Sequence, residues 1–398
     1  MAPVTPSPQP PARASLRFVA LMAYLIAGVA LAIDLMLASL VDIGAELSPA
    51  NPERATLVMG SFFLALGVGT FLVGPLLDSL GRRPVILWGV ALYIVGAILS
   101  WLAPSLTLML LGRALMGLGA AAPRVGVQAV IRDRFEGRQM AATISLVMMI
   151  FTLIPGVAPV LGAWVAEAFG WRAVFFVFVI FGVVGFAWFH LQQPETLRAR
   201  KPLSLAAWRA QVVEASGHAV FRQAMFIQLF VFASLYGFLT AGPAIFTQTY
   251  EIEDLYPYIF CIVSLTGAAA AFANAQLVEK LGMVRLIRTS LVFYSIAVVV
   301  GLAGLLAGGG LWAFLLPMFA GFFVLGFVIG NSQALGMQPL GHIAGTASAT
   351  LVAAATLGAG ALTIPIPVFF HTSATAMLVA QLIFTAAALW SAFQLEPD

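Results

Sequence analysis

Apolar runs of about twenty residues recur along nearly the whole chain, and most charged residues lie in the short stretches between them. A helix rises about 1.5 Å per residue, so each run can cross a hydrocarbon core of roughly 30 Å. The strands of a membrane barrel would alternate in polarity over about ten residues, and these runs do not. The sequence therefore predicts an all-α membrane protein.

We expect twelve transmembrane helices arranged as six and six. Their approximate bounds are 16–41, 55–78, 84–103, 106–131, 138–167, 171–191, 219–249, 255–279, 283–306, 311–337, 342–370 and 374–394. The longest interruption divides the chain into an N-terminal half at 16–191, a linker at 192–218 and a C-terminal half at 219–398. Residues 1–15 are rich in proline and small polar groups, which predicts a disordered tail. Leu205 and Trp208 among basic residues suggest a short interfacial amphipathic helix in the linker.

The basic residues indicate how the chain is oriented in the membrane. Most of the 19 Lys and Arg residues fall in one set of alternate loops and in the linker, whereas the opposite set has Arg54, Arg172 and the acidic stretch 251–254. Cytoplasmic loops retain Lys and Arg during insertion. We therefore expect the tail, the linker and both termini to be cytoplasmic.

Several functional classes lack the residues they need. Cys261 is the single cysteine and the four histidines are scattered, so we expect no disulfide, no metal site and no cofactor. A P-loop and a cluster of acid and base groups are both missing from the sequence, which argues against an enzyme. The basic residues lie in short loops without interleaved aromatics, so we expect no nucleic-acid partner. A channel would need a continuous polar lining, and intramembrane charge is confined to the N-terminal half.

A short repeat points to internal duplication. "DSLG" at 78–81 is echoed by "EKLG" at 279–282, and each follows the second span of its half. Two six-helix halves related by a parallel repeat form an architecture of secondary transporters, in which substrate binds near the midplane between the halves.

Several motifs resemble the major facilitator superfamily, and within it the twelve-helix drug:proton antiporters similar to the bicyclomycin and chloramphenicol exporters. "GPLLDSLGRRP" resembles the signature between helices 2 and 3, "LGRALMGLGAAA" at 111–122 resembles the helix 4 motif, and "GWRAVF" and "AGTASA" resemble helices 6 and 11. "PGVAPVLGAW" at 155–164 resembles the antiporter motif of helix 5, carried here by Pro155, Gly156, Pro159 and Gly162.

The resemblance implies a proton-coupled antiporter in a bacterial inner membrane, acting as a monomer. It implies export of small amphipathic compounds by alternating access of the two halves. The alternative on the same fold is an exporter of an endogenous metabolite, such as a metal chelator or an amino-acid derivative. The sequence leaves both open.

The charged cluster at 78–83 predicts a cytoplasmic gate. Asp78 at a helix end can pair with Arg82, Arg83 or neighbouring helix termini, and Gly74 and Gly81 permit close backbone approach. The other interpretation is that the arginines only reflect topology.

Charge inside the spans is confined to three clear cases, and each is costly in hydrocarbon without a partner or water. Asp34 and Arg113 both lie about 10 Å below the same membrane surface, so their depths match. We expect the pair to couple proton uptake to helix movement, because the distance to Arg113 would change the proton affinity of Asp34. The alternative is a permanent ion pair. Arg124 lies about three turns beyond Arg113 on the same face.

An apolar lining with a few polar groups would suit an amphipathic substrate. The candidates for this cavity are Tyr24, Met36, Met59, Phe62, Arg124, Gln128, Phe151, Phe230, Tyr236 and Asn331.

Overall fold

A computed structural model describes residues 15–135, 137–197, 199–200, 202, 204–363 and 373–396. The first fourteen residues of the expected disordered tail lie outside these ranges. The helices of the N-terminal part are α1 Leu16–Asp34, η1 Leu37–Ser39, α2 Leu40–Leu47, η2 Pro52–Thr56, α3 Leu57–Leu80, α4 Arg82–Trp101, α5 Leu106–Arg134, α6 Gly137–Phe169 and α7 Trp171–Gln192. Then follow α8 Leu205–Gly217, α9 Ala219–Gln248, η3 Glu253–Leu255, α10 Tyr256–Leu281, α11 Met283–Leu306, α12 Gly310–Met337, η4 Gln338–Ile343, α13 Ala344–Thr363 and α15 Ala374–Phe393.

The expected all-α membrane protein with twelve spans is confirmed. Twelve helical segments of the described chain are long and apolar enough to cross a membrane. The first segment extends six residues beyond its expected end at 41, from Leu16 to Leu47, and is broken inside. The last part of the span expected at 342–370 lies outside the described residues.

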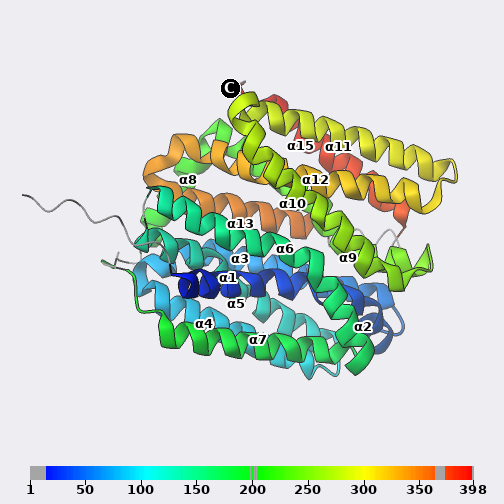
Figure 1. Cartoon of the computed structure of the whole chain (residues 1–398), viewed down its shortest axis with the longest axis horizontal. Helices are drawn as coiled ribbons and strands as arrows, with labels where there is room; N and C mark the ends of the chain where they lie inside the picture. The colour runs from blue at the N-terminus through cyan, green and yellow to red at the C-terminus, as the bar shows by residue number, and fades with distance from the viewer. Residues whose placement is uncertain are drawn as a thin grey trace, which may run out of the picture.

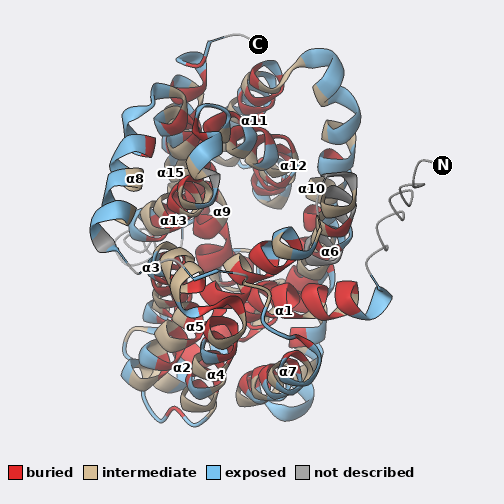
Figure 2. Cartoon of the chain, turned by 90° about the vertical axis from the view of Figure 1, so that its left-hand side faces the viewer, coloured by how far each residue is buried: buried red, intermediate tan, exposed pale blue. Residues whose placement is uncertain are grey.

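The helices pack in two groups that lie side by side (Figures 1 and 2). Helices α1 to α7 contact mainly one another, as do α9 to α15, and the two groups meet along α3 with α13 and along α6 with α10. We call these the N-terminal group and the C-terminal group. Helix α8 lies at one end of the molecule and α2 at the other (Figure 1), which we call the α8 end and the α2 end.

Small residues let the helices of the N-terminal group approach closely. At the contact of α4 with α5, a Cβ on Gly119 would lie 2.4 Å from the backbone nitrogen of Tyr93, and one on Gly96 would lie 2.5 Å from that of Met116. Small residues are common where membrane helices meet, because packing rather than the hydrophobic effect drives their association. Large apolar side chains such as Trp88, Phe272 and Trp390 are instead exposed on the outside.

The repeated motif occupies equivalent junctions. Gly81 ends α3 with φ 113° and Gly282 ends α10 with φ 79°, and in each case the next helix begins at the following residue. Glycine adopts such positive φ values without steric cost.

The linker helix α8 joins both groups. Its Glu214 is 2.7 Å from His342, and its Gln211 accepts a hydrogen bond from Thr346 at 2.5 Å. Trp208 packs edge-on against Phe71 of α3, with ring centroids 4.4 Å apart. A helix was expected here, but its apolar residues are not gathered on one face. The side chain of Leu205 lies outside the described part.

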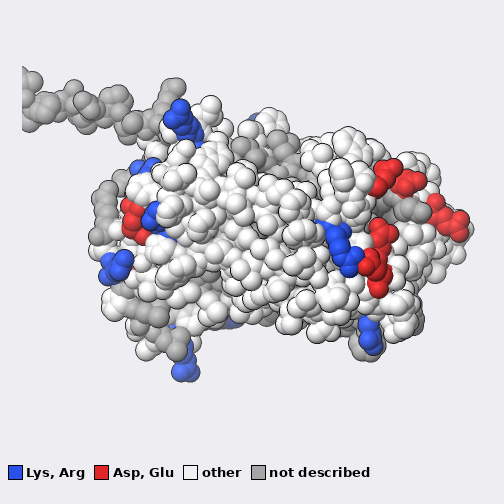
Figure 3. Space-filling model, turned by 90° about the horizontal axis from the view of Figure 1, so that it is seen from below, with Lys and Arg blue, Asp and Glu red and all other residues white. Residues whose placement is uncertain are grey.

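Charge is distributed unequally between the two ends (Figure 3). Basic residues gather at the α8 end, where α1 begins and where α3, α5 and α10 end, and most acidic residues visible in this view lie at the α2 end. The residues on which the predicted orientation depends therefore lie mostly at one end of the molecule, and the cytoplasmic location of that α8 end stays a prediction.

Candidate functional site

The first span breaks at Asp34. Helix α1 ends there, and a short 3-10 turn follows before α2. The Asp34 side chain belongs to a residue that is only 4% exposed, and within the described chain it has no hydrogen bond and no ion pair. Tyr256, at the start of α10, is close enough to interact with it electrostatically, and the Tyr256 hydroxyl is itself buried without a hydrogen bond. Asp34 is therefore a buried acid at an irregular point of the backbone.

Gly162 of the antiporter motif packs against this break. A Cβ built on Gly162 would lie 1.7 Å from the carbonyl oxygen of Leu35, so a larger residue could not occupy the position without a backbone shift. Gly156, in the same motif, faces α10 instead, and its Cβ would meet Ser264 at an ordinary contact distance of 3.5 Å. Pro155 and Pro159 lie inside α6, between and beside these glycines.

Arg113 is completely buried and does not contact Asp34. Its Nε donates to the Val58 carbonyl at 3.4 Å, and its terminal nitrogens lie 3.8 Å and 3.9 Å from the sulfurs of Met116 and Met59. The guanidinium also lies 4.4 Å from the ring centroid of Phe62. The described residues form four ion pairs, and none includes Arg113. The interpretation as a permanent ion pair with Asp34 is therefore wrong.

The predicted gate residues form a charged cluster at the α8 end. Arg82 Nη1 lies 2.5 Å from Asp78 Oδ1, and Arg82 Nε donates to Asp133 Oδ2 at 3.0 Å. Asp133 also accepts from Thr196 at 3.0 Å. Arg83 donates to the backbone carbonyl of His190 at 2.9 Å. The cluster thus joins α3, α4, α5 and α7. Gly74 lies one turn before Asp78 on α3, and a Cβ added to it would lie 3.8 Å from the Cβ of Ala349 on α13.

Glu195 was not predicted, and it anchors the start of α4. Its carboxylate accepts from the backbone nitrogens of Arg82 at 3.0 Å, Arg83 at 3.2 Å, Thr196 at 2.8 Å and Leu197 at 2.9 Å. A helix N-terminus is a favourable site for an anion. Partial burial raises the pKa of Glu195, but the four backbone donors outweigh it and hold this pKa below the usual range.

The glycine at this junction is required for two reasons. First, Gly81 has φ 113°, which residues with a side chain rarely adopt. Second, a Cβ added to Gly81 would clash with the Glu195 carboxylate, at 2.3 Å from Oε2. Glu195 and Asp133 could have been recognised as partners, because both lie on the same predicted side of the membrane as 78–83.

Arg124 lies where the two groups meet. Its side chain is close enough to the Tyr236 hydroxyl of α9 to interact with it. The Tyr236 ring stacks on Phe63 of α3, with centroids 3.7 Å apart and planes at 2°. Arg124 is partly exposed, and Gln128, one turn nearer the α8 end, is exposed.

The other cavity candidates do not gather at one place. Met36 is buried beside the break, Phe230 stacks on Phe384 within the C-terminal group at 6.5 Å, and the Asn331 amide donates to Asn274 at 2.7 Å. The side chain of Phe151 lies outside the described part.

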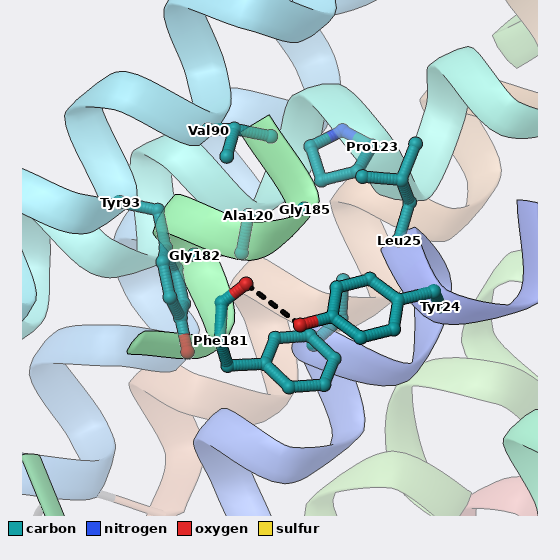
Figure 4. Close-up of a pocket in the computed structure, with 11 residues that line it drawn as sticks. Tyr24, Leu25, Val90, Tyr93, Ala120, Pro123, Phe181, Gly182 and Gly185 are labelled. Atoms are coloured by element: carbon teal, nitrogen blue, oxygen red, sulfur yellow. Dashed lines mark hydrogen bonds between the residues drawn. The ribbon is translucent and has the colours of Figure 1, made fainter. Parts of the chain in front are cut away.

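Tyr24 lines a cavity within the N-terminal group rather than a path between the groups (Figure 4). The cavity has about 30 Å³ of space and is bounded by α1, α4, α5 and α7. The Tyr24 hydroxyl donates to the Phe181 carbonyl at 2.9 Å, and their rings stack at 4.0 Å. Drug-sized ligands occupy pockets of roughly 300–1,000 Å³, so this cavity is too small to be a substrate site.

A second cavity occupies the matching position in the C-terminal group. It has about 10 Å³ of space and is bounded by α9, α11, α12 and α15. Tyr93 lines the first cavity and Tyr294 the second, and the two tyrosines are 201 positions apart, the offset of the two sequence repeats. The two groups therefore resemble each other in how their interiors pack, as well as in the order of their helices.

Comparisons with known proteins agree with this architecture. The chain is 27% identical over 343 residues to a bicyclomycin resistance protein homolog of Haemophilus influenzae, with 83% of each chain covered. It is 34% identical over 151 residues to the multidrug resistance protein MdtL of Shigella dysenteriae, with 38% of each covered. The crystal structure of a D-xylose-proton symporter superposes with a TM-score of 0.74 at 15% identity, covering 95% of this chain and 97% of the symporter. The pattern of the Major Facilitator Superfamily matches residues 14–363, and the chain belongs to this family.

Proposed function

We propose that the protein is a proton-coupled exporter of small amphipathic compounds. Residues 16–191 and 219–398 act as two halves that rock against each other and expose a site between them to either side in turn. The α8 end faces the cytoplasm of a bacterial cell, and the protein lies in the inner membrane with both termini inside. Export rather than import is supported by the resistance proteins among the relatives and by the glycines and prolines of the motif in α6.

The observation that carries proton coupling is the environment of Asp34. A charged carboxylate buried without a partner is costly, so its protonation state is tied to whatever surrounds it. The break after α1 allows that part of the backbone to rearrange, because it lies outside a continuous helix. Gly162 contacts this backbone directly. Protonation of Asp34 can therefore change the backbone at the break and, through the contact with Gly162, the position of α6. Helix α6 in turn packs against α10 of the other group.

Arg113 contributes in a different way from a fixed partner. Its positive charge is buried among thioethers, an aromatic ring and a backbone carbonyl, which are weak acceptors compared with a carboxylate. Movement of α1 relative to α5 in another state of the transport cycle would bring Asp34 nearer and change its proton affinity. In the present state the two charges are separate.

Transport in proteoliposomes tests this function. A susceptibility panel in an efflux-deficient host first identifies a compound to which the protein confers resistance, beginning with bicyclomycin. Uphill flux of that compound is then driven by a pH gradient. We expect Asp34→Asn to abolish this flux. Asp42→Asn, which alters an exposed acid on α2, is the matched control and should retain it. Uphill transport by Asp34→Asn with an unchanged dependence on the gradient would show that Asp34 is not the coupling site.

A further inference from the structure

The interior of the described spans carries more positive than negative charge. Arg113 and Arg124 lie well inside α5, and Asp34 is the acid inside the first span. None of the three takes part in an ion pair formed by the described residues. By contrast, Arg82 and Arg172, which lie at helix ends, both have carboxylate partners. A cation inside a span is costly without a counterion, so a ligand that supplies the missing negative charge gains free energy by binding there.

Arg124 is the cation that a ligand can reach. Arg113 is fully buried, whereas Arg124 is partly exposed. It faces the junction of the two groups, because its neighbour Tyr236 belongs to α9 and stacks on Phe63 of α3. Arg124 lies ten residues before the end of α5, which places it about 15 Å inside the α8 end.

A basic path leads from the α8 end to Arg124. Gln128 and Arg132 follow Arg124 at intervals of four residues, so all three share one face of α5. Both Gln128 and Arg132 are exposed, and the Arg132 guanidinium lies 3.9 Å from the Cβ position of Gly345 on α13. The path therefore runs along the junction. Such a stripe of one charge sign attracts ligands of the opposite sign.

The facing helices offer nothing to neutralise this path. Tyr236 of α9 and Gly345 of α13 face this path, and the sequences of α9 and α13 contain no Asp or Glu. On α5 itself, Asp133 is already paired with Arg82. Beside Arg124 lies an aromatic column, since Phe232, Tyr236 and Phe63 stack in succession at 5.7 Å and 3.7 Å. All three rings are buried in the present state, and the Tyr236–Phe63 stack joins the two groups there.

We propose that the transported compound is an organic anion, whose acidic group pairs with Arg124 and whose apolar, aromatic body packs against Phe232, Tyr236 and Phe63 once the two groups part at the Tyr236–Phe63 stack. The inference rests on the proposed transport function, since it names the substrate class of the same path between the groups. A cationic compound would be repelled by Arg124 and Arg132, and a neutral one would leave the Arg124 charge without a counterion.

Equilibrium binding to the purified full chain tests the proposal without a pH gradient. The probes are naphthoate, naphthamide and naphthylmethylammonium, which share one aromatic body and differ in charge. We expect naphthoate to bind about tenfold more tightly than the other two, since only its carboxylate can form a charge-assisted hydrogen bond with the Arg124 guanidinium. Added salt should weaken naphthoate binding.

Variants at Arg124 separate its charge from its packing. Arg124→Gln should remove the preference for naphthoate, whereas Arg124→Lys should retain it in weaker form because the charge remains. Arg209→Gln, on the exposed surface of α8, is the control and should bind like the unaltered protein. Size-exclusion chromatography confirms that each variant is folded.

Three results would overturn the proposal: preference for the ammonium probe, an unchanged preference in Arg124→Gln, or no saturable binding of any probe. The proposed proton coupling is tested by a different experiment, the gradient-driven flux in proteoliposomes. If that flux does not depend on the pH gradient, proton coupling is wrong, and the charge preference measured in equilibrium binding is unaffected.

Discussion

The carbonyl oxygen of Leu35 lies against the α-carbon of Gly162, so that no side chain fits between the two backbones. Leu35 directly follows the buried Asp34, and Gly162 belongs to the motif that resembles the antiporter signature. The first span can therefore break beside its acid only because the facing residue of α6 has no Cβ.

Gly162→Ala should impair transport and lower stability. The added Cβ would lie 1.7 Å from the Leu35 oxygen, and relief requires a shift of backbone at the break. Overpacking of this kind costs about 1–3 kcal/mol. Thermal unfolding and flux measure the two effects. Gly156→Ala is the matched control in the same motif, because its Cβ meets its nearest neighbour at 3.5 Å. Equal behaviour of the two variants would contradict this explanation.

Arg113→Met should abolish transport while leaving the protein at least as stable as before. The present guanidinium is fully buried and has no carboxylate partner, whereas Met can fill the same apolar surroundings. Flux assays and thermal unfolding in detergent test the two parts. A loss of several kcal/mol in the free energy of unfolding would instead assign Arg113 a structural role.

Asp78→Asn should reduce turnover more than it reduces stability. The Asp78 side chain is 43% exposed, and exposed ion pairs contribute about 0–1 kcal/mol. Asp133, with a side chain 18% exposed, keeps its bond to Arg82 in this variant. We expect Asp133→Asn to be the more destabilising change, and the comparison of their unfolding temperatures decides it. Unaltered turnover of Asp78→Asn would mean that Asp78 has no part in gating.

Glu195→Gln should make stability less dependent on pH. The folded-state pKa of Glu195 is lowered, so its stabilising contribution is present above the unfolded-state pKa and is lost as the pH falls through the folded-state pKa. The difference in unfolding temperature between the variant and the unaltered protein should therefore be largest near neutral pH and disappear in acid. The effect will be small, because the side chain is exposed. Glu167→Gln, at an exposed position, should show no such trend, and a constant difference for Glu195→Gln would contradict the assignment.

The twelve spans could be predicted because apolar length is a property of local sequence. The break after Asp34 could not, since the stretch Ile33–Leu37 contains neither proline nor glycine. Gly162, the residue that leaves room for the break, lies 128 positions away from Asp34, and only the packed structure brings the two together.

The residues of the site could be predicted only as far as the sequence indicates their depth in the membrane and the membrane surface to which they are nearer. Arg113 and Asp34 were identified as interior charges, yet equal depth does not determine which helix faces point toward each other. The stack of Phe63 on Tyr236 likewise depends on how the two groups dock. The partners of Arg82 were easier to predict from the sequence, because all of them lie at one membrane surface.

Helix α8 sets a condition on how far the two groups can separate at their α8 end. Glu195 and Thr196, which follow α7, are held to the N-terminal group through Arg82 and Asp133. The hydrogen bond of Gln211 and the close pairing of Glu214 attach α8 to the C-terminal group. Among the contacts that α8 makes, that of Trp208 with Phe71 of α3 is therefore the one that must slide or part when the groups separate, so α8 travels with the C-terminal group and its tryptophan sweeps over α3.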